Sequence, residues 1–475
     1  MKRLIVLAAF ITLVLVSCSG ERGVEPIDTQ PSVQLDPEFL AEELIAQTGW
    51  PDEDDQVRTP VGCGYIIGIE RQEILPGIAH YSYQLKIGLG DYDVIGLHRV
   101  VKEKKPYWPV RTCKSVFLQH GDAVGFEGVF LFGAVAPSVP DDQAIAVYLA
   151  KNNVDVWGID QPWVMVPAET ADFSFMADWG MQYHIDNLEV ALAVARFTRM
   201  ITGGGSGRMP LLGYSSGASL GYAYLNHEIS KPEPCRHVDG FIPVDIDYKT
   251  ANEDGRLSAC RNAAENEDQI SAGMYNTAIT FVPIALLAIN DPDGESPLAP
   301  GSGLTNYIVA LLAGSATHML ADMSPGFHYV AGEFDVTGLP TGFQFMTVET
   351  FFDFMLGASF HQPVAFIHDY HVITCDEEDS PFDDYLGDIT VPVFSLNSAG
   401  GFGEDGFYTT TLLGSTDIVT LNIQLYPSEY QMIDYGHIDM FAAENAEELV
   451  WTPVLNWIND HSCRRGKGDK SFKKD

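Results

Sequence analysis

The chain has 475 residues, with 27 Lys or Arg against 65 Asp or Glu, so its formal charge is −38. This length fits about two to three domain equivalents, or one large domain with an insertion. Apolar residues make up 46% of the chain, which excludes a disordered or collagen-like composition. The strong negative charge argues against binding to nucleic acid and against adsorption to anionic lipid surfaces.

The N-terminus predicts export. A short basic start, residues 1–3, precedes an apolar run over 4–16 that is too short to span a bilayer and is typical of a signal peptide. Residues 15–18, Leu-Val-Ser-Cys, resemble a bacterial lipoprotein signal, which implies cleavage at residue 17 and a lipid anchor on Cys18. The same resemblance, with Ser19 next, implies the bacterial cell envelope, at the outer membrane or cell surface. A plain secretory signal is the alternative, and 18–40 reads as the anchor and a flexible tether.

The cysteines and histidines bear on which disulfides and metal sites the sequence predicts. Because exported proteins keep disulfides, the cysteines other than Cys18 are expected to pair, and Cys235 with Cys260 is the first guess. No Cys-x-x-Cys segment occurs, which argues against a zinc ribbon. A polar cluster could suggest a metal, but scattered polar residues near a turn are the better interpretation, and we predict neither metal nor cofactor. The cluster comprises His361, His368, Asp369, His371 and Cys375.

Strand and helix patterns alternate through the first half of the body. Alternating apolar residues predict a hairpin over 80–101. Strands are then expected at 114–119, 154–159, 209–213 and 237–244, and helices at 141–151, 183–201 and 216–226. Strands separated by helices predict an α/β fold with a doubly wound, mostly parallel sheet.

The alternation stops at residue 248 and resumes at 389. The intervening segment, 248–388, contains apolar helical stretches at 281–290 and 304–320 and an aromatic stretch at 343–360. We interpret it as a large, mainly helical cap inserted before the last strands. The remaining predictions are strands at 389–396 and 421–426 and a helix at about 443–459. The core therefore comprises 41–247 and 389–462, followed by a basic tail, 463–475.

The segment Gly213-Tyr214-Ser215-Ser216-Gly217 has the form G-x-S-x-G and lies between a predicted strand and a predicted helix. A sharp strand–turn–helix raises the central hydroxyl above the sheet edge, and the glycines allow the strained turn. The helix N-terminus behind it favours developing negative charge. We therefore predict that Ser215 is a nucleophile.

A serine hydroxyl is a poor nucleophile without a base. His437 follows the last predicted strand and precedes the terminal helix, which is the placement expected of that base. An acid should orient the histidine and should follow the strand at 389–396. Asp405 is the first choice there, with Glu404 and Asp417 as alternatives; Asp245 and Asp247, after the strand at 237–244, rank behind them.

Two N–H groups must stabilise the oxyanion of the reaction. One is expected from Ser216, directly after the nucleophile. The other is expected from the loop after strand 114–119, where His120-Gly121-Asp122-Ala123 stands. We assign the N–H of Asp122, with Ala123 as the alternative. The charge of Asp122 is unusual there, because a carboxylate disfavours a neighbouring oxyanion.

Four segments together resemble the α/β-hydrolase superfamily, and within it the acid (gastric/lysosomal) lipase branch. They are VFLQHGD, VDVWGID, FSFMADWGMQYHIDN and LLGYSSGASLGY, and the later pieces VPV, GGFGED and GHIDMF stand in the same order. The resemblance covers about 80–245 and 385–460. It departs at Asp122, where that branch has an apolar residue, and at Asp160-Gln161-Pro162-Trp163, which replaces the usual Arg-Gly ending. The cap matches nothing we can assign.

These observations predict an exported serine hydrolase that cleaves carboxylic esters through an acyl-enzyme. The apolar, aromatic cap favours a small-molecule ester with an apolar acyl or aryl part. An amidase or peptidase on the same triad is an alternative. A second alternative is a surface lipoprotein that uses the fold to bind a ligand or partner without turnover.

Overall fold

The computed structural model of the chain describes residues 65–278, 280–319 and 326–462. The predicted signal peptide, Cys18, the tether and the basic tail lie outside these residues. Among the described residues, no helix combines the length and the apolar character needed to cross a membrane.

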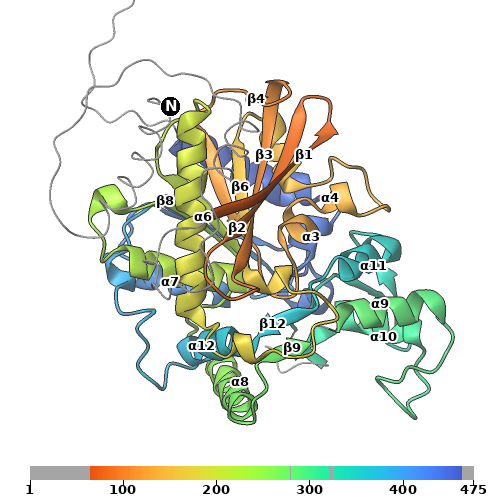
Figure 1. Cartoon of the computed structure of the whole chain (residues 1–475). Coiled ribbons are helices and arrows are strands. Elements are labelled where there is room, and N and C mark those ends of the chain that lie inside the picture. Colours follow the sequence, from red (N-terminus) through yellow and green to blue (C-terminus); the bar gives the residue numbers. More distant parts are fainter. Residues whose placement is uncertain (1–64, 279, 320–325, 463–475) are drawn as a thin grey trace, which may run out of the picture.

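A central sheet organises the described residues (Figure 1). Its strand order is β1-β2-β3-β6-β5-β7-β8-β13-β14, and β4 pairs with β3 at the side. The strands up to β3 are antiparallel, and those from β6 onward run parallel to one another. The bounds are β1 Tyr65–Leu75, β2 Ile78–Lys86, β3 Val94–Lys105, β4 Trp108–Pro109, β5 Ser115–Gln119, β6 Asp155–Asp160, β7 Met209–Tyr214, β8 Val238–Val244, β13 Val393–Ser398 and β14 Ile418–Ile423.

This topology is the α/β-hydrolase fold that the sequence predicts. The predicted hairpin is β2 and β3, which pair in antiparallel register. The predicted strands of the first half coincide with β5, β6, β7 and β8 to within two residues. The last strand begins three residues before the predicted start, at Ile418 rather than residue 421.

The sheet is buried on both faces by two apolar cores. Successive side chains of a strand point to opposite sides and so enter different cores. In β5, Val116 and Leu118 belong to one apolar core, whereas Phe117 belongs to the other. The first core packs against α3 Phe126–Phe130, α5 Ile145–Lys151 and α14 Thr452–His461. The second packs against α6 Met181–Ile201 and α7 Ser216–Glu228. The two cores hold the sheet rigid beneath the loops at its edge.

The segment between β8 and β13 forms the helical cap, which lies below the strands in Figure 1. Its helices are α8 Glu253–Ser271, α9 Phe281–Asn290, α10 Asn306–Ser315, α11 Val348–Leu356 and α12 Val364–Cys375. Side-chain oxygens of Asn252, Thr305 and Thr347 accept N–H bonds at the starts of α8, α10 and α11. Short two-stranded sheets join β9 Asn276–Ala278 to β12 His361–Pro363 and β10 Gly332–Phe334 to β11 Pro340–Phe343.

A disulfide between Cys260 and Cys375 ties α8 to α12. The predicted pairing of Cys235 with Cys260 is therefore wrong. Sequence proximity misled that prediction, because the Cα atoms of the true pair are 4.7 Å apart although 115 residues separate them. The disulfide also accounts for Cys375, which the sequence had grouped with nearby histidines.

Candidate active site

The sharp turn between β7 and α7 carries Ser215. Its backbone has φ 56° and ψ −134°, a conformation that is costly for a residue with a side chain. Two hydrogen bonds hold the strain in place: the Ser215 N–H donates to the Val244 carbonyl at 2.9 Å, and the Ser215 carbonyl accepts from the Ala218 N–H at 2.7 Å. The turn presents Ser215 to a pocket at the carboxyl ends of the parallel strands.

Glycines let the loop after β5 approach this turn. A Cβ at Gly217 would lie 2.2 Å from the His120 carbonyl oxygen, and a Cβ at Gly121 would lie 2.7 Å from the Cβ of Ser215. Real Cβ atoms do not come this close, so both positions require glycine. The nucleophile and the predicted oxyanion loop are therefore packed directly against each other.

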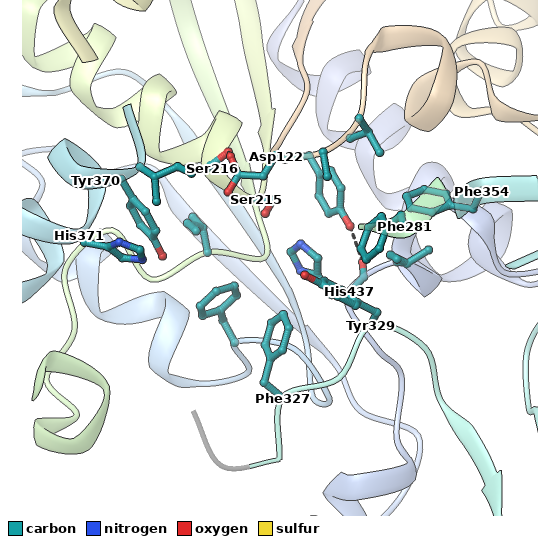
Figure 2. Close-up of a pocket in the computed structure, with 17 residues that line it drawn as sticks. Asp122, Ser215, Ser216, Phe281, Phe327, Tyr329, Phe354, Tyr370, His371 and His437 are labelled. Carbon is teal, nitrogen blue, oxygen red and sulfur yellow. Dashed lines mark hydrogen bonds between the residues drawn. The ribbon is translucent and has the colours of Figure 1, made fainter. Parts of the chain in front are cut away.

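His437 lies in the same pocket as Ser215, and their side chains face each other in Figure 2. It stands between η7 Ser428–Ile433 and α13 Asp439–Ala442. Its ring stacks on Tyr214 with centroids 4.7 Å apart, and the Tyr214 hydroxyl donates to the His437 carbonyl at 3.0 Å. The His437 N–H also donates to the His328 carbonyl at 3.1 Å. These contacts fix the imidazole beside the serine.

The carboxylate bonded to His437 is Asp245, not Asp405. The His437 Nδ1 lies 2.6 Å from Asp245 Oδ2, and the Asp245 side chain is fully buried. The structure therefore contradicts the preferred prediction, Asp405, and pairs His437 with an option that ranked behind it. Asp245 follows the last residue of β8 directly, and its own backbone has φ 52°.

The loop after β13 binds the acid instead of supplying it. The Ser398 and Phe402 N–H groups donate to Asp245 Oδ1 at 2.9 and 3.2 Å, and the Ser398 hydroxyl donates to Oδ2 at 3.0 Å. A Cβ at Gly401 would lie 2.0 Å from Oδ2, so only glycine lets this backbone wrap the carboxylate. Four donors, the histidine included, therefore surround one buried carboxylate.

The other predicted acids point elsewhere. Asp405 is exposed at the start of η6 Asp405–Leu412, where its Oδ2 accepts from Asn252 Nδ2 at 2.7 Å. Glu404 accepts from Asn422 at 3.2 Å. The Asp417 carboxylate lies 3.3 Å from His461. The Gly400–Gly403 turn carries the chain past His437 before these acids occur.

Asp247 is buried two residues beyond the acid. Burial, together with the charges of Asp405 and Asp245, raises its pKa to about 8. It is therefore neutral at pH 7. It lies behind the pocket residue Tyr370, whose pKa it raises, and it makes no contact with His437.

The loop after β5 lies where an oxyanion site is needed. Ser216 is the first residue of α7, so its N–H has no acceptor within the helix. Among the described residues, the N–H groups of Asp122 and Ala123 also donate to nothing. Ala123 has φ 60°, and its carbonyl accepts from the Ser359 N–H of the cap at 2.9 Å. All three predicted donors thus border the pocket that contains Ser215.

His120 fixes the shape of this loop. Its Nε2 accepts from the Gln161 N–H at 3.1 Å, so the ring proton is assigned to Nδ1, which lies 2.8 Å from the Gly121 carbonyl oxygen. Burial lowers the pKa of His120, which keeps the ring neutral and this tautomer in place. Gln161 belongs to the segment that departs from the acid lipase pattern, and here it has a clear structural role.

Figure 2 shows the pocket with an aromatic side and a polar side. The rings on the aromatic side include Phe281, Phe327, Tyr329, Phe354 and Phe402. Tyr370 and His371 of α12 lie opposite. The His371 Nδ1 is 2.9 Å from Asn266 Oδ1, and burial lowers the pKa of His371 to about 4, so the imidazole is neutral. No Lys or Arg is among the lining residues.

Metal-ligand geometry in the described residues occurs at two other places. One group is His80, His98 and Glu127, and the other contains the disulfide-bonded Cys260 and Cys375 with Glu377. Neither includes a residue that lines the pocket. The polar groups near Ser215 include the His437 imidazole with its Asp245 partner, the Asp122 carboxyl and backbone N–H groups.

One solved structure superposes well enough to support this fold. A candidate lipase from Sulfolobus solfataricus superposes with a TM-score of 0.56 at 20% identity, covering 83% of this chain and 99% of that chain. A thermophilic esterase from Thermogutta terrifontis gives 0.37 at 12% identity, over 80% and 98% of the two chains. Brefeldin A esterase, a bacterial homologue of human hormone-sensitive lipase, gives 0.40 at 13%, over 83% and 80%. No protein-family model matches the sequence, and neither does any curated protein.

Proposed function

We propose that the protein is a serine hydrolase of carboxylic esters, with Ser215, His437 and Asp245 as its triad. The observation that carries this proposal is the 2.6 Å contact between His437 Nδ1 and the buried Asp245, in a pocket that the strained Ser215 also lines. A neutral imidazole bonded through Nδ1 leaves Nε2 free to accept a proton. The chain order Ser215, Asp245, His437 is that of the superfamily.

The reaction follows from these roles. Ser215 Oγ attacks the ester carbonyl while His437 Nε2 takes the hydroxyl proton, and Asp245 stabilises the imidazolium that forms. The N–H groups of Ser216 and of Asp122 or Ala123 hold the oxyanion. His437 then protonates the departing alcohol and next activates the water that hydrolyses the acyl-enzyme. The aromatic side of the pocket favours an ester with an apolar acyl or aryl part, as in the acid lipase branch that the sequence resembles.

Hydrolysis of a graded ester panel tests this proposal. We expect p-nitrophenyl esters of short to medium acyl chains to be cleaved by the wild type, and both Ser215→Ala and His437→Ala to lose at least about 10⁴-fold in kcat. Matched anilides separate esterase from amidase chemistry. Absence of turnover by the wild type on every ester would overturn the proposal in favour of a binding protein.

We also propose that the protein is exported and anchored through Cys18. The disulfide between Cys260 and Cys375 supports an oxidising compartment. In a bacterial host, the full chain should carry radiolabelled palmitate and sediment with membranes, whereas Cys18→Ser should do neither. Labelling of both proteins, or of neither, would contradict the anchor.

A further inference from the structure

Asp122 presents a carboxyl group to the pocket beside the nucleophile (Figure 2). Two side chains donate to the same oxygen, Oδ1: the hydroxyl of Ser216 and the amide Nε2 of Gln362. Gln362 is a buried residue of β12 in the cap, so the contact links the oxyanion loop to the cap. Burial raises the pKa of Asp122, and the hydrogen bonds from Ser216 and Gln362 oppose this rise by favouring the carboxylate.

The second oxygen, Oδ2, receives no hydrogen bond from the described residues. Asp122 is half-buried, and its Oδ2 is not one of the fully enclosed, unpartnered side-chain atoms of the described residues. This oxygen is therefore accessible. Since Asp122 lines the pocket, this oxygen is open to whatever binds beside Ser215. An accessible carboxylate oxygen in a partly desolvated pocket attracts a positive charge more strongly than a surface carboxylate does.

The rest of the pocket suits the same ligand chemistry. No Lys or Arg is among the lining residues, whose basic side chains are the imidazoles of His371 and His437. Phe281, Phe327 and Tyr329 present aromatic rings, whose faces attract alkylammonium groups. The formal charge of −38 further favours cations and disfavours anions in the pocket. A carboxylate with aromatic rings and without Lys or Arg is a chemically consistent site for an alkylammonium group.

We propose that Asp122 is a specificity-determining residue, which selects ligands that carry an alkylammonium group and rejects ligands that carry a carboxylate. The inference rests on the proposed function in that the cation would belong to the ester substrate. The Oδ2 atom faces the ammonium, and Ser216 and Gln362 hold the carboxylate through Oδ1. Ser216 and Gln362 both donate to Oδ1, so this oxygen faces hydrogen-bond donors and not the oxyanion. This explains how a carboxylate is tolerated beside an oxyanion site.

Binding of small probes tests the site without turnover. Choline, its neutral isostere 3,3-dimethyl-1-butanol and the anion 3,3-dimethylbutanoate are titrated by calorimetry into the wild type and into Asp122→Asn. Asp405→Asn, which alters an exposed carboxylate, is the matched control. We expect the wild type and the control to bind choline at least about tenfold more tightly than the alcohol, and the anion least tightly. Asp122→Asn should reduce the ratio of choline to alcohol to about one.

Hydrolysis of butyrylcholine and 3,3-dimethylbutyl butyrate links the site to the reaction. The ratio of their kcat/KM values is compared within each variant, so a general loss of activity cancels. Equal binding of choline and the alcohol by the wild type would overturn the inference, whatever happens to the variant. Ester turnover without a choline preference overturns the inference alone. A choline preference without any ester turnover overturns the proposed function alone.

Discussion

The neighbouring strands β8 and β13 both end beside His437, and both are followed by carboxylates, yet only one carboxylate reaches the histidine. After β8, Asp245 comes at once and is buried against the ring. After β13, the chain turns through Gly400–Gly403, and Asp405 emerges at the surface bonded to Asn252. The loop after β13 contributes backbone and hydroxyl donors to Asp245 instead.

In this difference, one of two adjacent strands supplies the acid, and the loop after the other strand supports it. Both strand ends lie at the same sheet edge, so each could present a carboxylate to His437. What decides is the distance along the chain from the strand end: Asp245 is the next residue after β8, whereas Asp405 lies beyond a turn that leads away. Changes in the two loops should therefore have very unequal effects.

The largest expected effect comes from the acids themselves. Asp245→Asn should lower kcat for ester hydrolysis by about 10⁴-fold, because the amide no longer stabilises the imidazolium and favours the wrong tautomer. Asp405→Asn should change kcat by less than about threefold, since its carboxylate is exposed and bonded to Asn252 rather than to His437. Steady-state kinetics on one p-nitrophenyl ester measures both. A large loss in Asp405→Asn would reverse the assignment.

The next largest effect is expected in the supporting loop. Gly401→Ala places a Cβ where Asp245 Oδ2 lies, so the loop or the acid must shift, and we expect a loss of about 10²-fold in kcat. Gly387→Ala is a control, because its nearest neighbour would be 4.0 Å away. Equal activity of the two variants would show that the loop does not position Asp245.

A smaller effect is expected from one donor of that loop. Ser398→Ala removes the 3.0 Å hydroxyl bond to Asp245 Oδ2 but keeps the backbone N–H bond to Oδ1. A hydrogen bond to a charged group contributes about 1.5–3 kcal/mol, most of which the remaining donors should compensate. We expect a fall in kcat of about tenfold. A loss as large as that of Asp245→Asn would mean that the hydroxyl, rather than the backbone, holds the acid.

The smallest effect on activity is expected from a change at Asp439, which follows His437 closely in the chain. This change should instead affect stability. Asp439 Oδ2 accepts from the Ala331 and Gly436 N–H groups at 2.9 and 2.7 Å, and burial raises its pKa to about 7. In the folded state it keeps its proton above pH 4, whereas the unfolded chain releases it. Its contribution to stability is therefore present at acidic pH and is lost as the pH rises from about 4 to 7.

Asp439→Asn, which mimics the neutral acid, should remove this pH dependence. We expect the variant to unfold at a higher urea concentration than the wild type at pH 8, with the difference vanishing near pH 4. The contribution is on the order of a few kcal/mol across this range. If the wild type were instead more stable at pH 8 than the variant, the fold would stabilise the ionised form of Asp439, and its pKa would not be raised.

Local sequence patterns predicted Ser215 and His437 as candidate site residues, whereas the features that depend on long-range packing could not be predicted. Ser215 could be predicted because the turn, its glycines and the flanking strand and helix all lie within one short segment. His437 followed from its place between the last strand and the terminal helix. The acid depends on which of two adjacent loops bends toward His437, which sequence order alone leaves undecided. The pairing of Cys260 with Cys375 has the same origin, because only the packing of α8 against α12 brings them together.

The most direct test follows covalent labelling of Ser215 by a fluorophosphonate, with the adduct located by mass spectrometry. We expect one adduct, on Ser215, in the wild type and none in Ser215→Ala. The labelling rate should fall by orders of magnitude in Asp245→Asn and stay near that of the wild type in Asp405→Asn. No adduct on Ser215, or a rate that falls in Asp405→Asn and not in Asp245→Asn, would contradict a nucleophile activated through His437 and Asp245.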